Sequence, residues 1–353
     1  MFVEADSKPL LIMTDDTGMI QHSSFTIPDP NSGYTTDDNA RALIAAVMLY
    51  ERYKSQKFLK LIFRYLSFLI YAQNKNGGFR NFMDYSRHFL EENGSEDCFG
   101  RCLWCLGFTI NSEYLHNTIK YAPIEMIERA LPNIDGIIHI RGKAYTLIGL
   151  CLIYSFLHNH DISTDMFPSI SKGKIENYID KISDDIIDEF EKKSDRQWKW
   201  CEDELTYSNS IIPLSLLRSY TINKREKCFS TAMDSLNFLD NIYFKNGYFK
   251  PIGCRGWYKK GDPSPAEFDE QPVEACSTSL LYNEVYKITG TKEYKFKAEL
   301  CYEWFTGNNS SGKPLVNKQT GGCYDGIMDS RINLNTGAES ILAKIITQLI
   351  IDR

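Results

Sequence analysis

Helical periodicity runs along almost the whole of this 353-residue chain and constrains its fold more than any other feature. Apolar residues recur every three or four positions, which is the spacing of an amphipathic helix rather than of a strand. Together with capping residues at its ends, the pattern predicts helices over residues 39–53, 57–72, 97–110, 117–131, 140–158, 172–191, 208–221, 225–239, 272–288, 292–306 and 337–351. Residues 77–82 and 247–253 are expected to form short strands or hairpins.

The connections between these helices alternate in length. Short turns such as KSQK (54–57), INKR (222–225) and TGTK (289–292) alternate with longer loops rich in glycine, aromatic and acidic residues. This alternation is typical of αα-hairpins arranged around a ring, so we expect an all-α (α/α)6 barrel with a few short β-hairpins in the loops. Because no linker-like segment divides the chain, the sequence predicts one domain over 1–353, with 1–33 as an irregular segment packing on the barrel.

Composition excludes several classes of function. The net charge is −6 and no run of Lys and Arg stands out, which argues against nucleic-acid binding. We find no apolar run of membrane-spanning length and no signal-peptide pattern at the N-terminus, so we expect a cytoplasmic protein without a membrane partner. The ten cysteines fall within helical patterns and are expected to be reduced. Cys102 and Cys105 have CxxC spacing, but no second ligand pair accompanies them, so no metal and no cofactor is expected.

Similar polar motifs precede the first helix of each hairpin. These six motifs are TTDDNAR, GSEDCFGR, IRGKAY, CEDELTYSN, FDEQPVEA and LNTGAES, and five of them are acidic. Helix capping explains one Ser, Thr or Asp at each start, but it does not require Arg41, Arg101 and Arg141 in the same turns. If the six first helices form an inner ring, the motifs converge on one cavity, and this indicates a functional site.

The aromatic residues near these motifs favour a carbohydrate ligand. Sugar rings have apolar faces that suit aromatic side chains and hydroxyl rims that suit acids, amides and arginines. We interpret Trp198 and Trp200 in RQWKWCEDE, and Trp257 and Tyr258 in GCRGWYKKGD, as facing the sugar. Trp104 and Trp304 lie inside helical patterns and are interpreted as core residues.

Glycoside cleavage needs two carboxyl groups, one protonated and one ionised, on either side of the scissile bond. The sequence offers too many acids to choose two: Asp37, Asp38, Glu96, Asp97, Glu202, Asp203, Glu204, Asp269, Glu270, Glu274, Asp325 and Glu339. Glu339 also has the spacing of a capping box with Thr336, and Glu274 follows the first-turn Pro272 closely enough to point inward. Neither a catalytic Ser–His or Cys–His pattern nor a phosphate-binding loop is evident.

The long motifs resemble a bacterial family of six-hairpin, glycosidase-like proteins, found alone or fused to a retaining-type glycosyltransferase. The resemblance covers nearly the whole chain and includes GYTTDDNARAL (33–43), WKWCEDELTYSNSIIPLSLL (198–217) and GGCYDGIMDSRINLNTGAESILA (321–343). It implies an (α/α)6 toroid and a link to carbohydrate metabolism, without an assigned catalytic pair. Unsaturated glucuronyl hydrolases share this fold and use aspartates at the starts of neighbouring inner helices, where Asp38 and Asp97 stand here.

We therefore predict a glycoside hydrolase acting on short oligosaccharides. The catalytic candidates are Asp38 and Asp97 first, then Glu274 and Asp269. The expected substrate-binding residues are Tyr34, Asp37, Arg41, Glu96, Arg101, Arg141, Trp198, Trp200, Trp257, Tyr258, Glu270, Gln271, Tyr324, Asp325 and Glu339. Two alternatives stay open: a non-catalytic carbohydrate-binding or scaffold partner of a glycosyltransferase, and a sugar epimerase. The epimerase would rely on histidine pairs, and His22 and His139 form no evident motif.

Overall fold

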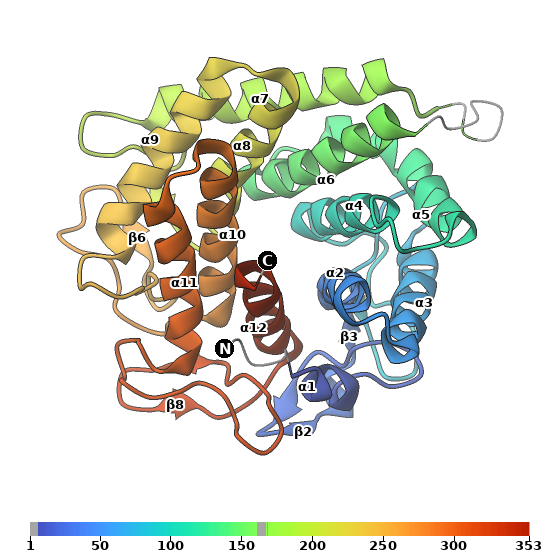
Figure 1. Cartoon of the computed structure of the whole chain (residues 1–353), viewed down its shortest axis with the longest axis horizontal. Coiled ribbons are helices and arrows are strands. Elements are labelled where there is room, and N and C mark those ends of the chain that lie inside the picture. The colour runs from blue at the N-terminus through green and yellow to red at the C-terminus, as the bar shows by residue number, and fades with distance from the viewer. Residues whose placement is uncertain (1–5, 161–166, 168, 353) are drawn as a thin grey trace. The chain divides into compact units, whose positions relative to one another are not determined.

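The computed structural model describes residues 6–160, 167 and 169–352. Helices dominate this part of the chain (Figure 1). The α-helices are α1 Lys8–Ile12, α2 Thr36–Tyr53, α3 Gln56–Ala72, α4 Glu96–Ile110, α5 Asn117–Ala130, α6 Ile140–Asn159, α7 Lys172–Lys193, α8 Ile211–Asn223, α9 Glu226–Tyr243, α10 Pro272–Thr289, α11 Lys292–Thr306 and α12 Ala338–Ile351. Every helix predicted from the sequence is present, so the periodicity was a sound guide to helix positions.

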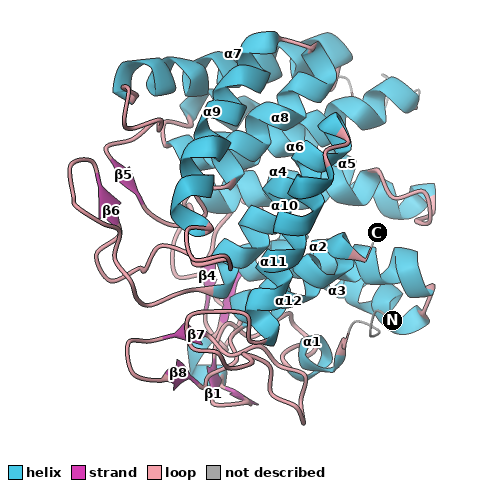
Figure 2. Ribbon diagram, turned by 60° about the vertical axis from the view of Figure 1, so that its left-hand side comes forward, coloured by secondary structure: helices cyan, strands magenta, loops and turns pink. Residues whose placement is uncertain are grey.

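The strands are short and lie in the loops (Figure 2). They form four two-stranded antiparallel sheets in the described residues: β1 Ser23–Ser24 with β2 Ile27–Pro28, β3 Tyr34–Thr35 with β4 Phe82–Met83, β5 Glu204–Leu205 with β6 Tyr258–Lys259, and β7 Gly326–Ile327 with β8 Ile332–Asn333. The predicted extended segment 77–82 reaches into β4, whereas 247–253 contains no strand, so that prediction is wrong. Instead, backbone bonds join Gly253 and Arg255 to residues 266 and 268.

The helices group into two compact units, which we describe separately. The N-terminal unit holds residues 14–21 and 30–184, and the C-terminal unit holds the described residues of 1–13, 22–29 and 185–353. In the N-terminal unit α2 packs on α3 and α4, and α4 packs on α5 and α6. In the C-terminal unit α10 packs on α8, α11 and α12, and α8 packs on α9. Each unit thus contains a row of three first helices, α2–α4–α6 or α8–α10–α12.

The single domain predicted over 1–353 stays a prediction. Within its expected irregular N-terminal segment, residues 1–5 lie outside the described residues. The rest contains α1, which packs on α12, the β1–β2 hairpin and a 3-10 turn over Pro30–Ser32.

Local sequence explains where the first helices begin. The hydroxyl of Thr35 accepts from the Asp38 N–H at the start of α2, and the hydroxyl of Ser95 accepts from the Cys98 N–H at the start of α4. Both are N-cap residues of the expected type, with acids in the first turn. The helix predicted from residue 208 begins at Ile211, because Asn209 instead bonds the backbone of Thr206 in a turn.

A glycine seam joins α4 and α6. It consists of two glycines seven residues apart on each helix, Gly100 and Gly107 on α4 and Gly142 and Gly149 on α6. A Cβ added to Gly142 would lie 2.7 Å from the Cβ of Glu96, and one added to Gly149 would lie 2.7 Å from the carbonyl carbon of Leu103. Contacts therefore advance along both helices in the same direction, so α4 and α6 are parallel and their backbones touch.

Helix α6 is long and apolar enough to cross a membrane, with a mean hydropathy of 1.2, so the prediction that no apolar run reaches that length is wrong. It is alone in this among the described helices. Because 67% of the stretch is buried inside the protein and its glycines contact α4, its apolar character is that of a core helix.

Candidate active site

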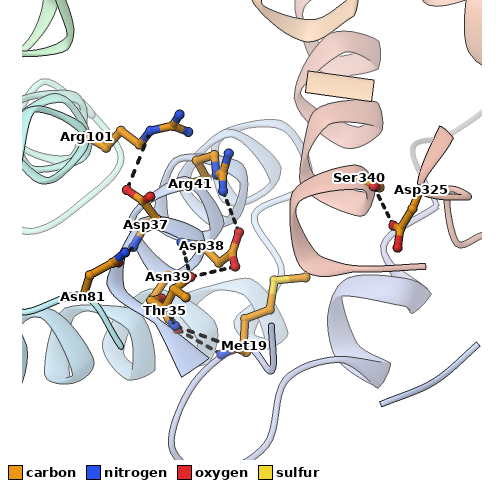
Figure 3. A network of polar contacts seen from close by, with 10 residues as sticks. All are labelled: Met19, Thr35, Asp37, Asp38, Asn39, Arg41, Asn81, Arg101, Asp325 and Ser340. Carbon is orange, nitrogen blue, oxygen red and sulfur yellow. Dashed lines mark hydrogen bonds and ion pairs between the residues drawn. The ribbon is translucent and has the colours of Figure 1, made fainter. Parts of the chain in front are cut away.

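In the N-terminal unit, three of the six polar motifs meet at one end of the helix row. The glycine seam sets the first turns of α4 and α6 side by side, and an ion pair links the first turn of α2 to α4. We call Asp37, Asp38, Arg41 and Arg101 the carboxylate–arginine cluster (Figure 3). These residues were predicted to converge, and the structure brings them together.

Asp38 is tied into the first turn of α2. Its side chain is almost fully buried, with one oxygen accepting from the Thr35 hydroxyl at 2.7 Å and the other 2.7 Å from Arg41 Nη2 (Figure 3). The Asp38 carboxylate therefore holds the hydroxyl of Thr35, the N-cap residue of α2, and also has a guanidinium counterion.

Asp37 has a different environment. Its Oδ1 lies 3.6 Å from Nε of Arg101, which is an ion-pair distance, but this buried oxygen accepts no hydrogen bond. Burial raises the pKa of the Asp37 carboxyl, and the nearby guanidinium groups of Arg101 and Arg41 oppose this shift only in part. The negative charges of Asp38 and Asp97 add to the rise, which also shows that Asp97 lies close by. Asp37 thus favours the protonated form more than an exposed aspartate does.

Two arginines of the predicted site, Arg101 on α4 and Arg141 on α6, are buried. The guanidinium carbon of Arg101 lies 4.4 Å from the centre of the Tyr145 ring on α6, one turn after Arg141. Tyr145 was not among the predicted site residues. It is the last residue of the IRGKAY motif, and an aromatic residue in the same motif as Arg141 was the available signal.

Glu96 serves the neighbouring helix rather than a ligand. Its Oε2 accepts the backbone N–H groups of Ile138 and His139 at 3.0 and 2.7 Å, just before α6 begins, and lies 3.1 Å from the His139 ring. A carboxylate at this place satisfies N–H groups that the helix itself leaves free. This role supports a structural function for Glu96, where we had predicted substrate binding.

The C-terminal unit repeats this arrangement with different partners. Glu274 is fully buried and accepts the Ser208 N–H at 2.5 Å, which links α10 to the turn before α8. Glu270 is also buried and accepts from Trp304 Nε1 at 2.9 Å and from the Ser310 hydroxyl. Burial raises the pKa of Glu270, although both hydrogen bonds oppose the shift. Trp304 is a core residue, as predicted.

Asp325 caps α12. It accepts the Gly337 N–H at 2.7 Å and the Ser340 hydroxyl, also at 2.7 Å, and the second of these bonds is drawn in Figure 3. Burial raises the pKa of the Asp325 carboxyl. The proposed capping box of Glu339 with Thr336 is wrong, because the Thr336 N–H donates to Phe25 O and Ser23 Oγ.

The remaining candidates of this unit lie in partly exposed positions. Asp269 lies 3.2 Å from Arg255 Nε, and Gln271 directly precedes α10. The Tyr324 hydroxyl accepts a hydrogen bond from Asn317. Trp257 precedes β6 and Tyr258 is its first residue, and both are half-buried.

Three aromatic residues were wrongly predicted to face a substrate. Trp198 and Trp200 were expected to face a sugar, but only 5% of Trp198 and none of Trp200 is exposed. Trp198 packs edge-on against Phe238 and Tyr258, so it fills the core beneath this loop. Tyr34 was expected to bind substrate, but it is 1% exposed and its hydroxyl donates to Asp15 at 2.6 Å. Trp104, predicted to be core, is only half-buried and stacks on Tyr145.

Histidines and thiols have no place in the cluster. All six histidines are exposed, including His22 and His139. The ten cysteines are free thiols and nine are buried, and burial raises the pKa of Cys102 and Cys105 well above its usual value. Within residues 6–160, 167 and 169–352, no group of His, Cys, Asp and Glu has the geometry of a metal site.

Comparison with known proteins identifies similar structures but no sequence relatives. No protein-family model and no curated protein sequence matches the chain. A cellobiose 2-epimerase from Bacillus thermoamylovorans is similar with a TM-score of 0.70 and 11% identity, over 97% of this chain and 94% of that one. A D-mannose isomerase gives 0.67 and 9%, over 98% and 96%.

A third similar structure is an inactive α-1,6-mannanase variant from Salegentibacter, with two consecutive aspartates replaced by alanine, in complex with α-1,6-mannotetrose. Its TM-score is 0.60 at 11% identity, over 98% of this chain and 95% of that one. These likenesses span nearly the full length of each protein and confirm the fold predicted from the sequence. The chain therefore has the (α/α)6 six-hairpin, glycosidase-like fold.

Proposed function

We propose that this protein is a carbohydrate-active enzyme, and specifically a glycoside hydrolase whose general acid is Asp37. One observation carries the proposal: a largely buried carboxyl in the cluster has a raised pKa and an oxygen without a hydrogen bond. A general acid must hold its proton near neutral pH and keep it available to a leaving group. Among the cluster's two carboxyls, only Asp37 combines these properties.

Asp38 is the complementary carboxylate. Arg41 and Thr35 hold its two oxygens in place, as expected of the group that activates water or attacks the sugar. In this scheme Asp37 protonates the glycosidic oxygen while Asp38 supplies negative charge to the oxocarbenium-like transition state. Asp97, the partner of Asp38 in our sequence-based pair, remains a candidate because its charge acts on Asp37.

The similar structures support a carbohydrate substrate. The mannanase variant described as inactive lacks two consecutive aspartates, which is the spacing of Asp37 and Asp38. The other two proteins act on sugars as an epimerase and an isomerase. The fold alone does not determine the reaction, and the choice between reactions rests on the residues of the cluster.

A sugar epimerase or isomerase is the second candidate. It is favoured by the higher TM-scores, 0.70 and 0.67, of the two structures in that class. Such a reaction requires a base that removes a carbon-bound proton, and the exposed histidines do not offer an enclosed one. Partnership with a glycosyltransferase, as a non-catalytic scaffold, stays a third prediction.

The test is a screen of neutral and acidic oligosaccharides in D2O, followed by NMR. Hydrolysis releases new reducing ends, whereas epimerisation or isomerisation through proton abstraction incorporates deuterium at a ring carbon. On the substrate found, Asp37→Asn and Asp38→Asn should each lower kcat about a hundredfold or more, the usual scale for acid–base catalysis. Asp188→Asn, an exposed site, is the matched control and should leave kcat unchanged. Normal turnover by both cluster variants would refute the assignment.

A further inference from the structure

A polar cavity lies in the C-terminal unit, formed largely by the β7–β8 hairpin (Figure 2) and by the loop after α11. Its volume is about 210 Å³. At roughly 30 Å³ for each water molecule, this corresponds to about seven waters, so the cavity suits one small ring rather than a chain of sugars. None of the four residues of the carboxylate–arginine cluster lines this cavity.

Two positively charged side chains line this cavity. Lys313 comes from the loop after α11, and Arg331 directly precedes β8. Both side chains are exposed, and among the described residues neither forms an ion pair with a carboxylate. Asp329 lines the cavity as well, so its lining side chains carry a net formal charge of +1. A net positive cavity with an unengaged guanidinium favours an anionic group, which arginine binds in a bidentate manner.

The remaining lining suits a sugar ring. Phe268 and Met328 supply an apolar wall that can contact the face of a pyranose. Ser310 donates its own proton to Glu270, so its oxygen is left to accept a hydrogen bond from a ligand hydroxyl. Ser330, which directly precedes Arg331 in the sequence, adds another hydroxyl to the lining. The cavity thus combines cations that can bind an anionic group, oxygens that can accept from sugar hydroxyls, and an apolar wall that can contact the sugar ring.

We propose that this cavity binds an acidic monosaccharide unit, that is, a sugar ring bearing a carboxylate or a phosphate. The proposal takes its ligand class from the proposed function, because it assumes a carbohydrate ligand. Ser310 connects the cavity to Glu270, the residue two positions before α10, through a direct hydrogen bond. An occupant would therefore be recognised next to one of the six polar motifs, and would set a preference for acidic over neutral sugars.

Binding can be tested without any turnover. Saturation-transfer NMR and calorimetry with D-glucuronate, glucose 6-phosphate, inorganic phosphate and neutral glucose distinguish the two acidic groups and the contribution of the ring. We expect saturable binding of glucuronate or glucose 6-phosphate at least tenfold tighter than that of glucose. Inorganic phosphate should bind more weakly than the acidic sugars, because it leaves the apolar wall uncovered.

Arg331→Gln and Lys313→Gln should each weaken acidic-sugar binding about tenfold or more, the effect expected for a lost charge-assisted bond. Lys318→Gln removes an equally exposed cation from the same loop outside the cavity, and should change affinity less than twofold. Equal affinity for glucose and glucuronate, an equal loss in Lys318→Gln, or no binding of either acidic sugar would overturn the proposal. Since Asp37 is not involved, loss of the proposed catalytic role would leave these binding results unchanged.

Discussion

Substituting Gly149 by alanine tests the glycine seam between α4 and α6. The new Cβ would lie 2.7 Å from the carbonyl carbon of Leu103 and 2.8 Å from the backbone nitrogen of Trp104. Carbon atoms in contact prefer about 3.5–4.0 Å, so the two backbones would have to separate locally by roughly 1 Å. Because both atoms belong to a helix backbone, no side-chain rotation can relieve the clash.

The expected cost follows from two opposing effects. Overpacking of this kind usually destabilises a core by about 1–3 kcal/mol, and a clash with backbone lies at the upper end of that range. Replacing glycine by alanine within a helix recovers about 1 kcal/mol. We therefore expect a net loss of about 2 kcal/mol, or a fall in Tm of roughly 4–8 °C for a unit of this size.

Thermal and urea unfolding followed by circular dichroism provide the measurement. Gly173→Ala is the matched control, because Gly173 is also helical, in α7, and a Cβ there would meet no atom within 4 Å. The control should stabilise the protein by up to about 1 kcal/mol. If the Gly149→Ala protein is as stable as the Gly173→Ala protein, the backbones of α4 and α6 are not in contact, and the proposed glycine seam between them is refuted.

Three further predictions follow from the contacts of single residues. Since burial raises the folded-state pKa of Asp37 above its unfolded value, the carboxyl's contribution to stability is complete below about pH 3.9 and is lost as pH rises through the folded pKa. The Tm of Asp37→Asn should therefore match that of the parent at pH 3.5 and exceed it at pH 8, and a constant difference would contradict the raised pKa. Glu96→Ala removes both caps of α6 and should cost about 1–2 kcal/mol in urea titrations, with Glu96→Gln losing less because its amide oxygen still accepts. Thiol titration in denaturant without reductant should count ten free cysteines, and a value of eight or fewer would indicate a disulfide.

Sequence periodicity predicted the helices because each apolar stripe and each cap is a local signal. The capping residues Thr35 and Ser95 stand directly before the helices they start, so their effect needs no knowledge of tertiary structure. The spacing of seven between Gly100 and Gly107, matched by Gly142 and Gly149, was also visible. Its meaning required the partner helix, because glycine in a helix otherwise only lowers stability.

The roles of the acids were less predictable, because a carboxylate has the same sequence signature whether it caps its own helix, caps a neighbour or stays available to a ligand. Asp37 and Asp38 are adjacent, yet one has a buried oxygen without a hydrogen bond and the other is fully paired. The predictions for Trp198 and Trp200 were wrong for a similar reason. Trp198 and Trp200 lie in a polar segment, and only the tertiary fold shows that they point into the core.

Helix caps that come from a distant part of the chain affect the order in which the helices can be completed during synthesis. Glu96 is synthesised 42 residues before Ile138, whose N–H it accepts. The capping carboxylate of α6 is therefore already part of the chain when α6 leaves the ribosome. For the turn before α8 the order is reversed. The Ser208 N–H donates to Glu274, which is synthesised 66 residues later. At a synthesis rate of about 5–20 residues per second, this delay lasts roughly 3–13 s. The N-terminal unit can thus consolidate its row of helices while the chain grows, whereas the start of α8 stays incomplete until α10 has been translated.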